Sequence, residues 1–517
     1  MTVRSDRLLG RSLFFTLCFV ISLLLGVHFY LVSPFVASYD IANFTLAVGQ
    51  YDLANLQPHF PGYPFFILLA TGLARLGLEP VRTLGIVSTL GFTSGLIPLY
   101  WLLKRQSFDT ARLLAAFTVI SVASLVVISA TGMSDGLALG VLCWFMWSVE
   151  RARHGHFRLL PYLLFGLLMA TRLSYAPFGI VLLFLLWQTR KDSWQLLSEL
   201  ATLLLAQLAW LLPVAFSVGG PASFAQLSLS FVTGHFSDWG GTAQTDEASL
   251  IERLGLTLKQ IVWHGLGFTS WLGLSSGLFL FCQRIRPLPL WWSVTGAGYF
   301  LWVWLAQNID KPRHVSPLVL LLVFLLVRHL SVRWLVPFLC IQLVMGSIAL
   351  YRQATIEPAT IQLADAITGL PASATIFTDE EDRQFLMKRP DATIVPIGSV
   401  SKWRAEPKSA EVYLTGRLFK RLRAEDVSIE VTEVFHFTSD PRFEPEDAEA
   451  RLYRMILREG ADWDEYHWNR QHSYDSKRNC RDCAKAVSRT RPTCSGPAGI
   501  SKSSVHSKPL SDDTSCL

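Results

Sequence analysis

The sequence is dominated by long apolar runs that begin near its N-terminus and recur as far as about Tyr351. The first run, from Ser12 to Pro34, contains no Asp, Glu, Lys or Arg. A helix of this run is about 35 Å long at about 1.5 Å per residue, enough to cross a hydrocarbon core of about 30 Å. Lipid offers the backbone no hydrogen-bond partners, so such runs must be helical. We therefore expect a polytopic α-helical membrane protein.

Composition agrees with this class, since 51% of the 517 residues are hydrophobic and only 17% are charged. A soluble chain of this length would divide into several domains with polar surfaces. A signal peptide is the alternative for the first run. That run is too long for the apolar region of a signal peptide and shows no convincing small-residue cleavage site, so we interpret it as a membrane span.

The basic residues of this chain, whose net charge is +6, cluster in short polar gaps between the apolar runs. Such clustering is typical of the cytoplasmic loops of membrane proteins and not of a nucleic-acid-binding patch. The clusters are Arg4/Arg7/Arg11, Lys104/Arg105/Arg112, Arg151/Arg153/Arg158, Arg190/Lys191, Arg284/Arg286 and Arg328/Arg333.

Placing these gaps in the cytoplasm predicts about eleven transmembrane helices, with the N-terminus inside and the C-terminal region outside. If the further apolar stretch Pro61–Leu78 crossed the membrane, every later basic gap would change from the cytoplasmic to the outer side. We therefore expect this stretch to stay at the outer face as an interfacial or re-entrant helix. The eleven predicted spans are 12–34, 81–103, 112–130, 135–149, 159–171, 175–189, 194–217, 258–282, 288–305, 315–327 and 334–351.

Three regions follow from this threading: a membrane domain (1–351, with a first outer loop at 35–80), a soluble α/β domain (352–460) outside the cytoplasm, and a tail (461–517). The tail is poor in aliphatic residues, and we expect it to be disordered. Its cysteines leave disulfides and a metal site open. In the α/β domain we expect strands at Ala374–Thr378, Ala392–Pro396, Ala410–Leu414 and Val427–Phe437, and helices at 358–369, 380–388 and 446–458.

Acidic residues and a histidine stand in the first outer loop. Asp40 and Asn43 directly follow the first span, and Asp52 comes later in the loop. An aspartate in such a place is also a common helix cap. His59 lies among prolines that restrict the backbone and help to aim its ring; the alternative is a rigid interfacial turn with aromatic anchors.

Basic residues at two other outer positions suggest an anion site. Lys311, Arg313 and His314 lie on a loop between two spans, where the charge bias disfavours them. Arg313 is the best candidate for a lipid phosphate, because its planar fork can hold two oxygens. Arg172 lies between two short apolar runs and needs a partner or a function, unless it snorkels at a turn. Asp135 is better interpreted as a helix cap.

The order of these segments, "SYDIANF", "PHFPGYP", "MSDG", "ATRLS" and "DKPRHVSP", together with their membrane side, resembles the GT-C superfamily of integral-membrane glycosyltransferases that use polyprenyl-phosphate sugars. The resemblance is to the protein O-mannosyltransferase and aminoarabinose-transferase branches. It covers about residues 10–350 in layout and only these short segments in sequence.

The resemblance implies transfer of a sugar from a polyprenyl-phosphate donor to an acceptor at the outer face of a bacterial plasma membrane. It implies that Asp40 is the catalytic carboxylate, that His59 is the loop-one histidine, and that Arg313 contacts the donor phosphate. Many members have two adjacent acids where this chain has only Asp40, so a divalent cation stays open and no metal ligand is assigned. The other candidate substrate-binding residues are Lys311, His314, Arg172 and Asp52.

The residue types agree with this activity, because glycosyl transfer needs a base for the acceptor and positive charge for the departing phosphate. The alternatives are a secondary transporter or lipid flippase, and a non-enzymatic scaffold. Transporters place ionisable residues near the bilayer midplane and show internal repeats, whereas here the polar residues gather at span ends and we find no obvious repeat.

Overall fold

The computed structural model describes most of the chain up to residue 456. The predicted disordered tail lies outside the described residues. Those described are 2–104, 108–246, 248–267, 290–379, 381–397, 402–403, 411–425, 427, 429–439 and 448–456.

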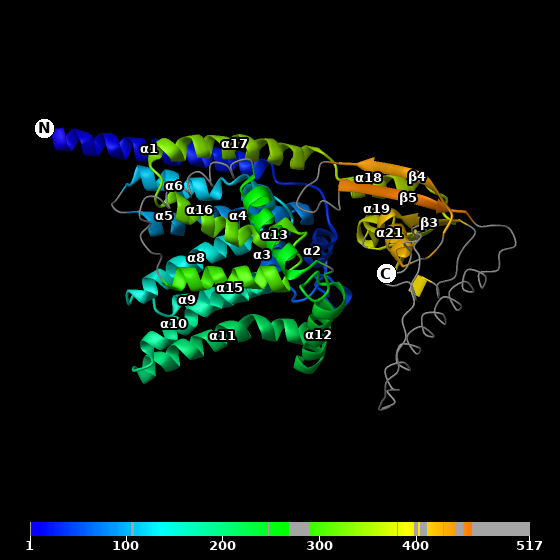
Figure 1. Ribbon diagram of the computed structural model, residues 1–517, viewed down its shortest axis with the longest axis horizontal. Coiled ribbons are helices and arrows are strands. Elements are labelled where there is room, and N and C mark those ends of the chain that lie inside the picture. The colour runs from blue at the N-terminus through cyan, green and yellow to red at the C-terminus, as the bar shows by residue number, and fades with distance from the viewer. Residues whose placement is uncertain are drawn as a thin grey trace, which may run out of the picture. The chain divides into compact units, whose positions relative to one another are not determined.

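Among the described residues that precede residue 356, all regular structure is helical apart from one isolated bridge in the first outer loop (Figure 1). Its longer helices are α1 (Thr2–Tyr30), α2 (Tyr39–Gly49), α3 (Pro64–Ala74), α4 (Pro80–Ser94), α5 (Leu96–Leu103), α6 (Thr110–Ile120), α7 (Ala123–Ser129), α8 (Asp135–Arg153), α9 (Leu160–Thr171), α10 (Ile180–Thr189), α11 (Ser193–Ser217), α12 (Pro221–Gly234), α13 (Leu250–Lys259), α15 (Leu290–Ala306), α16 (Ser316–Val327) and α17 (Val332–Thr355). The short elements are η1 (Leu53–Asn55), η2 (Leu173–Gly179), η3 (His235–Trp239), η4 (Gln260–Gly265) and η6 (Pro312–Val315).

Helices occupy the predicted spans throughout the described residues, although much of the span 258–282 lies outside them. The count of eleven is not confirmed. Among the described residues, four helices are long and apolar enough to cross a membrane, or five if the bent pair α6 and α7 forms one span. The four are Arg11–Tyr30, Pro80–Leu103, Ser193–Ser217 and Val332–Gly369.

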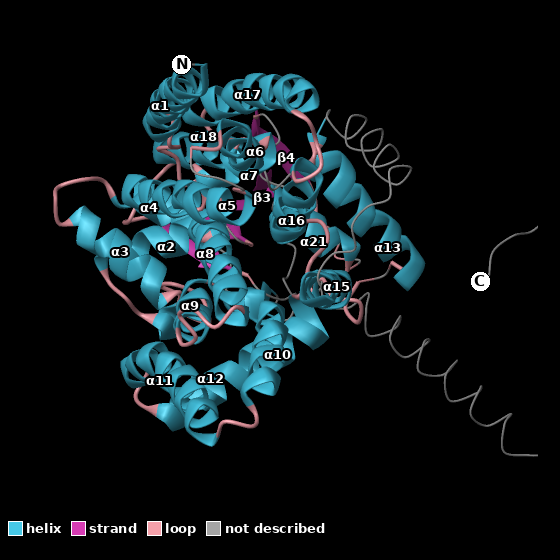
Figure 2. Cartoon of the chain, turned by 90° about the vertical axis from the view of Figure 1, so that its left-hand side faces the viewer, coloured by secondary structure: helices cyan, strands magenta, loops and turns pink. Residues whose placement is uncertain are grey.

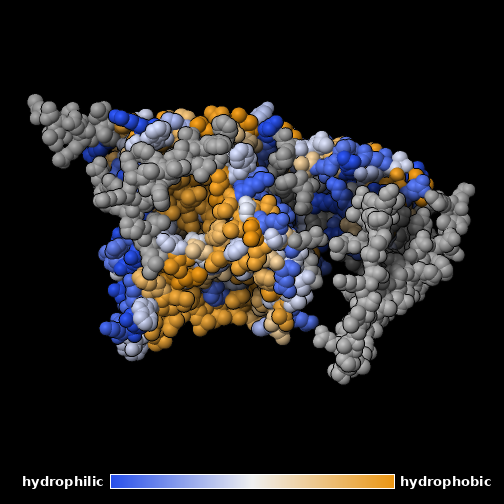
Figure 3. All heavy atoms as spheres, in the orientation of Figure 1, coloured by the Kyte–Doolittle hydropathy of each residue, from blue (hydrophilic) through white to orange (hydrophobic). Residues whose placement is uncertain are grey.

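Helices α1 and α11 expose large apolar side chains, including Phe19 on α1 and Leu205 and Phe216 on α11. Such exposure is costly in water but favourable against lipid tails. Figure 3 shows apolar residues in a broad band over the helical part, with polar residues toward the ends of the helices. This surface is that of an integral membrane protein.

Helix α8 lies in the interior of the bundle and packs against α4, α5 and α9 (Figure 2). Its close approach to α4 requires a glycine, since a Cβ on Gly140 would lie 1.8 Å from the carbonyl oxygen of Gly91. The absence of a side chain at Gly140 lets the backbones of α8 and α4 lie in contact. The N-terminus of α8 begins at Asp135, and that end of the helix carries part of the candidate site described below.

Within the stretch Pro61–Leu78, only Pro64–Ala74 forms a helix, α3, which has 11 residues and Pro64 in its first turn. Proline suits that position because its missing N–H would have no partner in the helix. A helix of this length is about 16 Å long and cannot cross a hydrocarbon core of about 30 Å. The length agrees with the prediction of a non-crossing helix.

The α/β domain contains a five-stranded sheet in the order β2-β1-β3-β5-β4. Strands β1, β2 and β3 are parallel, and β5 pairs antiparallel with both β3 and β4. The strands are β1 (Thr375–Thr378), β2 (Thr393–Pro396), β3 (Val412–Thr415), β4 (Val431–Thr438) and β5 (Glu449–Met455), and the helical elements are α18 (Ala359–Ala366), η7 (Ile367–Gly369), α19 (Asp382–Lys388) and α21 (Gly416–Ala424).

The predicted helix at 446–458 is wrong where the structure describes it, because Glu449–Met455 is strand β5. The segment is rich in Ala, Glu, Arg and Leu, which favour helix in isolation. Its position between β3 and β4 overrides that preference, and the buried Ala450 and Leu452 face the core at the spacing of two that a strand requires. Helix α21 was not predicted.

The α/β domain contacts the first outer loop. Arg383 of α19 donates a hydrogen bond from Nη2 to the carbonyl oxygen of Asn55, at 2.9 Å. Helix α19 also packs against α2. Segments in such contact lie on one side of a membrane, so the domain and the first outer loop share a side.

We predict that single cysteines at Leu76, after α3, and at Lys420, in α21, react in intact cells with a membrane-impermeant maleimide. A cysteine at Phe157, which follows α8, should react only after permeabilisation. All three side chains are well exposed, at 76%, 75% and 62%, so differences in labelling report membrane side. The measurement is labelling yield in a cysteine-free background. The opposite pattern, with Phe157→Cys labelled in intact cells and Leu76→Cys labelled only after permeabilisation, would mean that α3 crosses.

Candidate functional site

Asp40 lies in the first turn of α2, at the point where the chain leaves the first predicted span. The cap of α2 is Ser38, whose hydroxyl accepts a hydrogen bond from the N–H of Ile41. The alternative interpretation of Asp40 as the helix cap is therefore wrong, because the neighbouring serine performs that role. The Asp40 carboxylate is available for other contacts.

Asp40 forms an ion pair with Arg313, which lies 273 residues later in η6. Nη2 of Arg313 donates to Oδ2 of Asp40 at 2.6 Å, and the arginine side chain is only 7% exposed. Nη1 of Arg313 also contacts the sulfur of Met133 at 3.9 Å. The pair joins the two predicted key residues, the acid after span one and the basic residue of the late loop.

His59 is aimed at Asp40 by the turn that begins α3. Gly62 has a φ of +97°, and a Cβ there would lie 2.2 Å from the hydroxyl oxygen of Tyr51, so the turn requires glycine. Nδ1 of His59 lies 3.6 Å from Oδ1 of Asp40, and its Nε2 lies 2.9 Å from the hydroxyl oxygen of Tyr63. The rings of His59 and Tyr63 meet edge to face.

Burial and charge set the protonation of these three groups. Burial raises the pKa of Tyr63 to about 12, so its hydroxyl stays protonated. Burial also lowers the pKa of His59, despite the opposing charge of Asp40. Burial alone would raise the pKa of Asp40, but the positive charge of His59 when it is protonated, and that of Arg313 at all times, hold the pKa of Asp40 well below its usual range. The Tyr63 hydroxyl therefore donates to Nε2 of a neutral His59, whose Nδ1–H faces an ionised Asp40.

A second ion pair lies at the start of α8. Nη1 of Arg172 donates to Oδ2 of Asp135 at 2.9 Å and to the hydroxyl of Ser134 at 3.1 Å. Both charged side chains are buried. Arg172 therefore has a partner and does not snorkel, and the interpretation of Asp135 as a helix cap omitted its main contact. Buried charges are tolerated only when paired in this way.

Tyr63 connects the two pairs electrostatically, because its hydroxyl responds to the charges of Arg172, Asp40, Arg313 and Asp135. The arrangement combines two carboxylates, two arginines and a hydrogen-bonded tyrosine–histidine pair. Such a group can bind an anion and accept a proton within one small region.

The other basic residues predicted for the late loop have separate roles. The charge of Lys311 acts on Asp40 and helps to lower its pKa. His314 donates from Nδ1 to the carbonyl oxygen of Asn308 at 2.9 Å, and its own carbonyl accepts from the Tyr299 hydroxyl at 3.1 Å. Burial and the charge of Arg313 lower the pKa of His314 well below its ordinary value. A neutral His314 shapes the loop and brings no charge to it.

Asp52 makes the contacts of a capping residue within the first outer loop. Its carboxylate accepts from the backbone N–H of Asn55 at 3.2 Å and from the Asn55 side chain at 2.7 Å. It thereby caps η1. We leave Asp52 out of the proposed site, although the sequence made it a candidate.

Among the described residues, no group of three or more His, Cys, Asp or Glu side chains is arranged to hold a metal ion. Asp40 has a guanidinium on one oxygen and an imidazole toward the other. This set of partners does not fit a divalent cation at Asp40, because cations of that kind need several oxygen ligands.

Three participants were missed by sequence reasoning: Tyr63, Asp135 and Tyr299. The sequence presents Tyr63 as an interfacial aromatic anchor, yet it is buried against His59. Tyr299 lies inside an apolar run without any local signal. Asp135 could have been found from the sequence, because a buried arginine such as Arg172 requires an acidic partner. The two residues lie 37 positions apart, so nothing local in the sequence identified them as a pair.

Comparison with family models found no match, and comparison with curated proteins also found none. Among solved structures, the chain is similar to ArnT from Cupriavidus metallidurans bound to undecaprenyl phosphate, with 14% identity and a TM-score of 0.49, over 86% of this chain and 98% of that one. The apo structure of the same ArnT gives the same identity and TM-score over 88% and 98%.

We predict that His59 makes the protein sensitive to mild acid. The pKa of His59 is lowered in the folded protein, whereas in the unfolded chain it is about 6.5. The contribution of His59 to the stability of the fold is therefore complete above about pH 6.5 and declines as the pH falls below that value. His59→Gln should narrow the drop in melting temperature between pH 7.5 and pH 5. The exposed His156 is the matched control, and His156→Gln should keep the full drop. An unchanged drop in His59→Gln would show that His59 is not held neutral.

Proposed function

We propose that the protein is a glycosyltransferase that moves a sugar from a polyprenyl-phosphate donor to an acceptor at the outer face of a bacterial plasma membrane. The observation that carries the proposal is the Asp40–Arg313 ion pair, with His59 beside it. It combines a base and a phosphate-binding group at the end of the first predicted span. A lipid-linked donor presents its phosphate at that depth, because its tail lies in the bilayer.

In the proposed reaction the acceptor attacks the anomeric carbon of the donor sugar, and the bond from that carbon to the phosphate oxygen breaks. Asp40 takes the proton of the acceptor, and the electron pair of the broken bond leaves on the phosphate. Arg313 holds the departing phosphate, with Lys311 adding positive charge. Fixed charges aimed at developing charge are usually the largest contribution to catalysis.

The ion pair also ties base strength to donor binding. While Arg313 contacts Asp40, the carboxylate is held at a low pKa and is a weak base. A phosphate that binds Arg313 competes with Asp40 for the same guanidinium and brings negative charge beside the carboxylate. Both effects raise the pKa of Asp40, so the base gains strength when the donor is in place.

The positions of the charged residues favour an interfacial enzyme over a transporter or flippase. Asp40 and Asp135 lie in the first turns of α2 and α8, Arg172 follows the last residue of α9, and Arg313 lies in the short element η6. All four therefore stand at helix ends. A transporter places such groups near the bilayer midplane, within broken helices.

We expect Asp40→Asn to lower the transfer rate by about 10²–10⁴-fold, the range that general base catalysis contributes. The substitution keeps the side chain's shape, and α2 keeps its cap because Ser38 is unchanged. The measurement is sugar transfer by purified protein supplied with a panel of polyprenyl-phosphate sugars. Asp52→Asn, in the same loop, is the control and should stay within about twofold of the natural protein. Near-normal transfer by folded Asp40→Asn protein would remove Asp40 from the mechanism.

We expect Arg313→Ala to weaken donor binding by at least about tenfold, since hydrogen bonds to charged groups are worth about 1.5–3 kcal/mol. Arg313→Lys should restore only part of the affinity, because lysine lacks the planar fork. Binding of a polyprenyl phosphate in nanodiscs measures the effect. Equal affinity in all three proteins would make Arg313 a structural partner of Asp40 alone and transfer phosphate binding to Arg172.

A further inference from the structure

The C-terminal end of α15 is closed by side chains and backbone from a distant part of the chain. The last carbonyls of a helix have no partner inside it, so each needs one from outside. The four consecutive carbonyls at 304–307 all have such partners in the segment 235–253. The partners are Arg253 Nε for Trp304 at 3.2 Å, the N–H of Ala243 for Leu305 at 2.9 Å, His235 Nε2 for Ala306 at 2.8 Å and Arg253 Nη2 for Gln307 at 2.9 Å.

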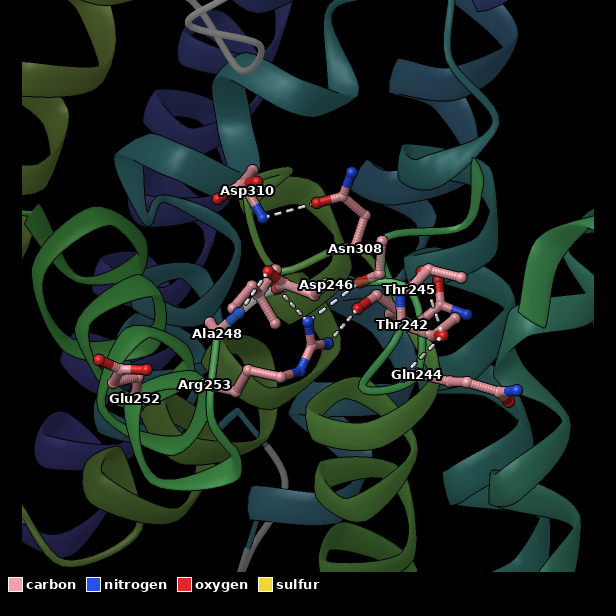
Figure 4. Close-up of polar contacts among 12 residues, drawn as sticks. Thr242, Gln244, Thr245, Asp246, Ala248, Glu252, Arg253, Asn308 and Asp310 are labelled. Atoms are coloured by element: carbon pink, nitrogen blue, oxygen red, sulfur yellow. Dashed lines mark hydrogen bonds and ion pairs between the residues drawn. The ribbon is translucent and has the colours of Figure 1, made fainter. Parts of the chain in front are cut away.

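Arg253 is the centre of this arrangement (Figure 4). Its side chain is fully buried. Besides the carbonyls of Trp304 and Gln307, it donates to the carbonyl of Gly241 at 3.2 Å and pairs with the Asp246 carboxylate. Its guanidinium thus joins the end of α15 to the loop before α13. Lysine could not replace it, because one ammonium cannot reach acceptors spread around a planar fork. Its positive charge also suits a helix C-terminus.

The closed end of α15 leads directly into the loop that carries Arg313. The carbonyl of Asn308 accepts from His314, and the Asn308 side chain accepts from the N–H of Asp310 at 2.8 Å. Gln260 donates to the carbonyl of Ile309 at 3.0 Å. The loop is thereby held from Gln307, which Arg253 binds, as far as His314, the residue next to Arg313.

We propose that Arg253 is a positioning residue that acts on donor binding through Arg313. It fixes the start of the loop 307–311, and this loop sets where the Arg313 guanidinium stands relative to Asp40. The proposal rests on the proposed function, since Arg313 is taken as the phosphate-binding group. Stability alone does not explain a buried arginine at this position, because apolar residues of similar volume commonly stabilise a protein core equally well. The Arg253 guanidinium, which has acceptors on several sides, instead holds the start of the loop 307–311 in one position.

The first experiment is amide hydrogen exchange over residues 308–315 in the purified full-length protein. Arg253→Lys should speed exchange in this segment. The matched control is Arg389→Lys, because Arg389 is likewise buried and donates to two carbonyls, those of Ile367 at 2.9 Å and Pro371 at 3.2 Å, in the α/β domain. The control should leave the segment unchanged. Exchange at the natural rate in Arg253→Lys would overturn the proposal.

The second experiment asks whether Arg253 acts through Arg313. Arg253→Lys should raise KM for the polyprenyl-phosphate donor about tenfold, and kcat should fall with it because Arg313 also holds the departing phosphate. When combined with Arg313→Ala, it should add nothing further, because residues that act through one another are not additive. Additive losses in the double variant, or a fall in kcat without a change in KM, would overturn the proposal.

The two experiments separate this proposal from the proposed function. If the natural protein transfers no sugar from any donor, the proposed function fails, while the exchange measurement still decides whether Arg253 holds the loop. If Arg253→Lys does not fold, Asp246→Asn takes its place, since it removes the charge that pairs with the same guanidinium and leaves the carbonyls that Arg253 binds in place. Faster exchange over 308–315 in that variant supports the proposal, and unchanged exchange contradicts it.

Discussion

The ion pair between Asp40 and Arg313 is the interaction on which the candidate site depends. It joins the first outer loop to the loop between α15 and α16, and so ties the beginning of the helical part to its end. A carboxylate and a guanidinium this poorly exposed are stable only because each compensates the other. The same contact makes Asp40 a weak base until another anion takes a share of Arg313, which gives the pair a part in chemistry as well as in structure.

Two neighbouring segments of the chain, one on each side, hold the Asp40–Arg313 pair in place. On the Asp40 side, the Ser38 cap sets the start of α2, and the turn at Gly62 turns His59 and Tyr63 inward. On the Arg313 side, the closed end of α15 holds the loop through Arg253. The Arg172–Asp135 pair lies close enough for its charges to act on Tyr63, so the hydroxyl, imidazole and carboxylate form one coupled group.

Hydropathy and charge predicted the helical architecture well, because the bilayer requires every crossing segment to be apolar and helical. The charge pattern also predicted that the segment containing α3 does not cross, and the 11 residues of α3 are too few to do so. Asp40, His59 and Arg313 were predictable as candidates because polar residues are conspicuous at span ends. Their pairing was not, because nothing local records a partner 273 residues away. Strand β5 was missed for a related reason: its neighbours β3 and β4, and not its own composition, make it a strand.

The most direct test is a structure of the full-length protein in a nanodisc with a polyprenyl phosphate. The account predicts the phosphate at the end of the first span, with at least one oxygen within about 3 Å of the Arg313 guanidinium. It also predicts an Asp40 carboxylate that no longer holds Arg313 at 2.6 Å and faces the sugar side of the phosphate. A phosphate bound elsewhere, with the Asp40–Arg313 pair intact, would contradict the account.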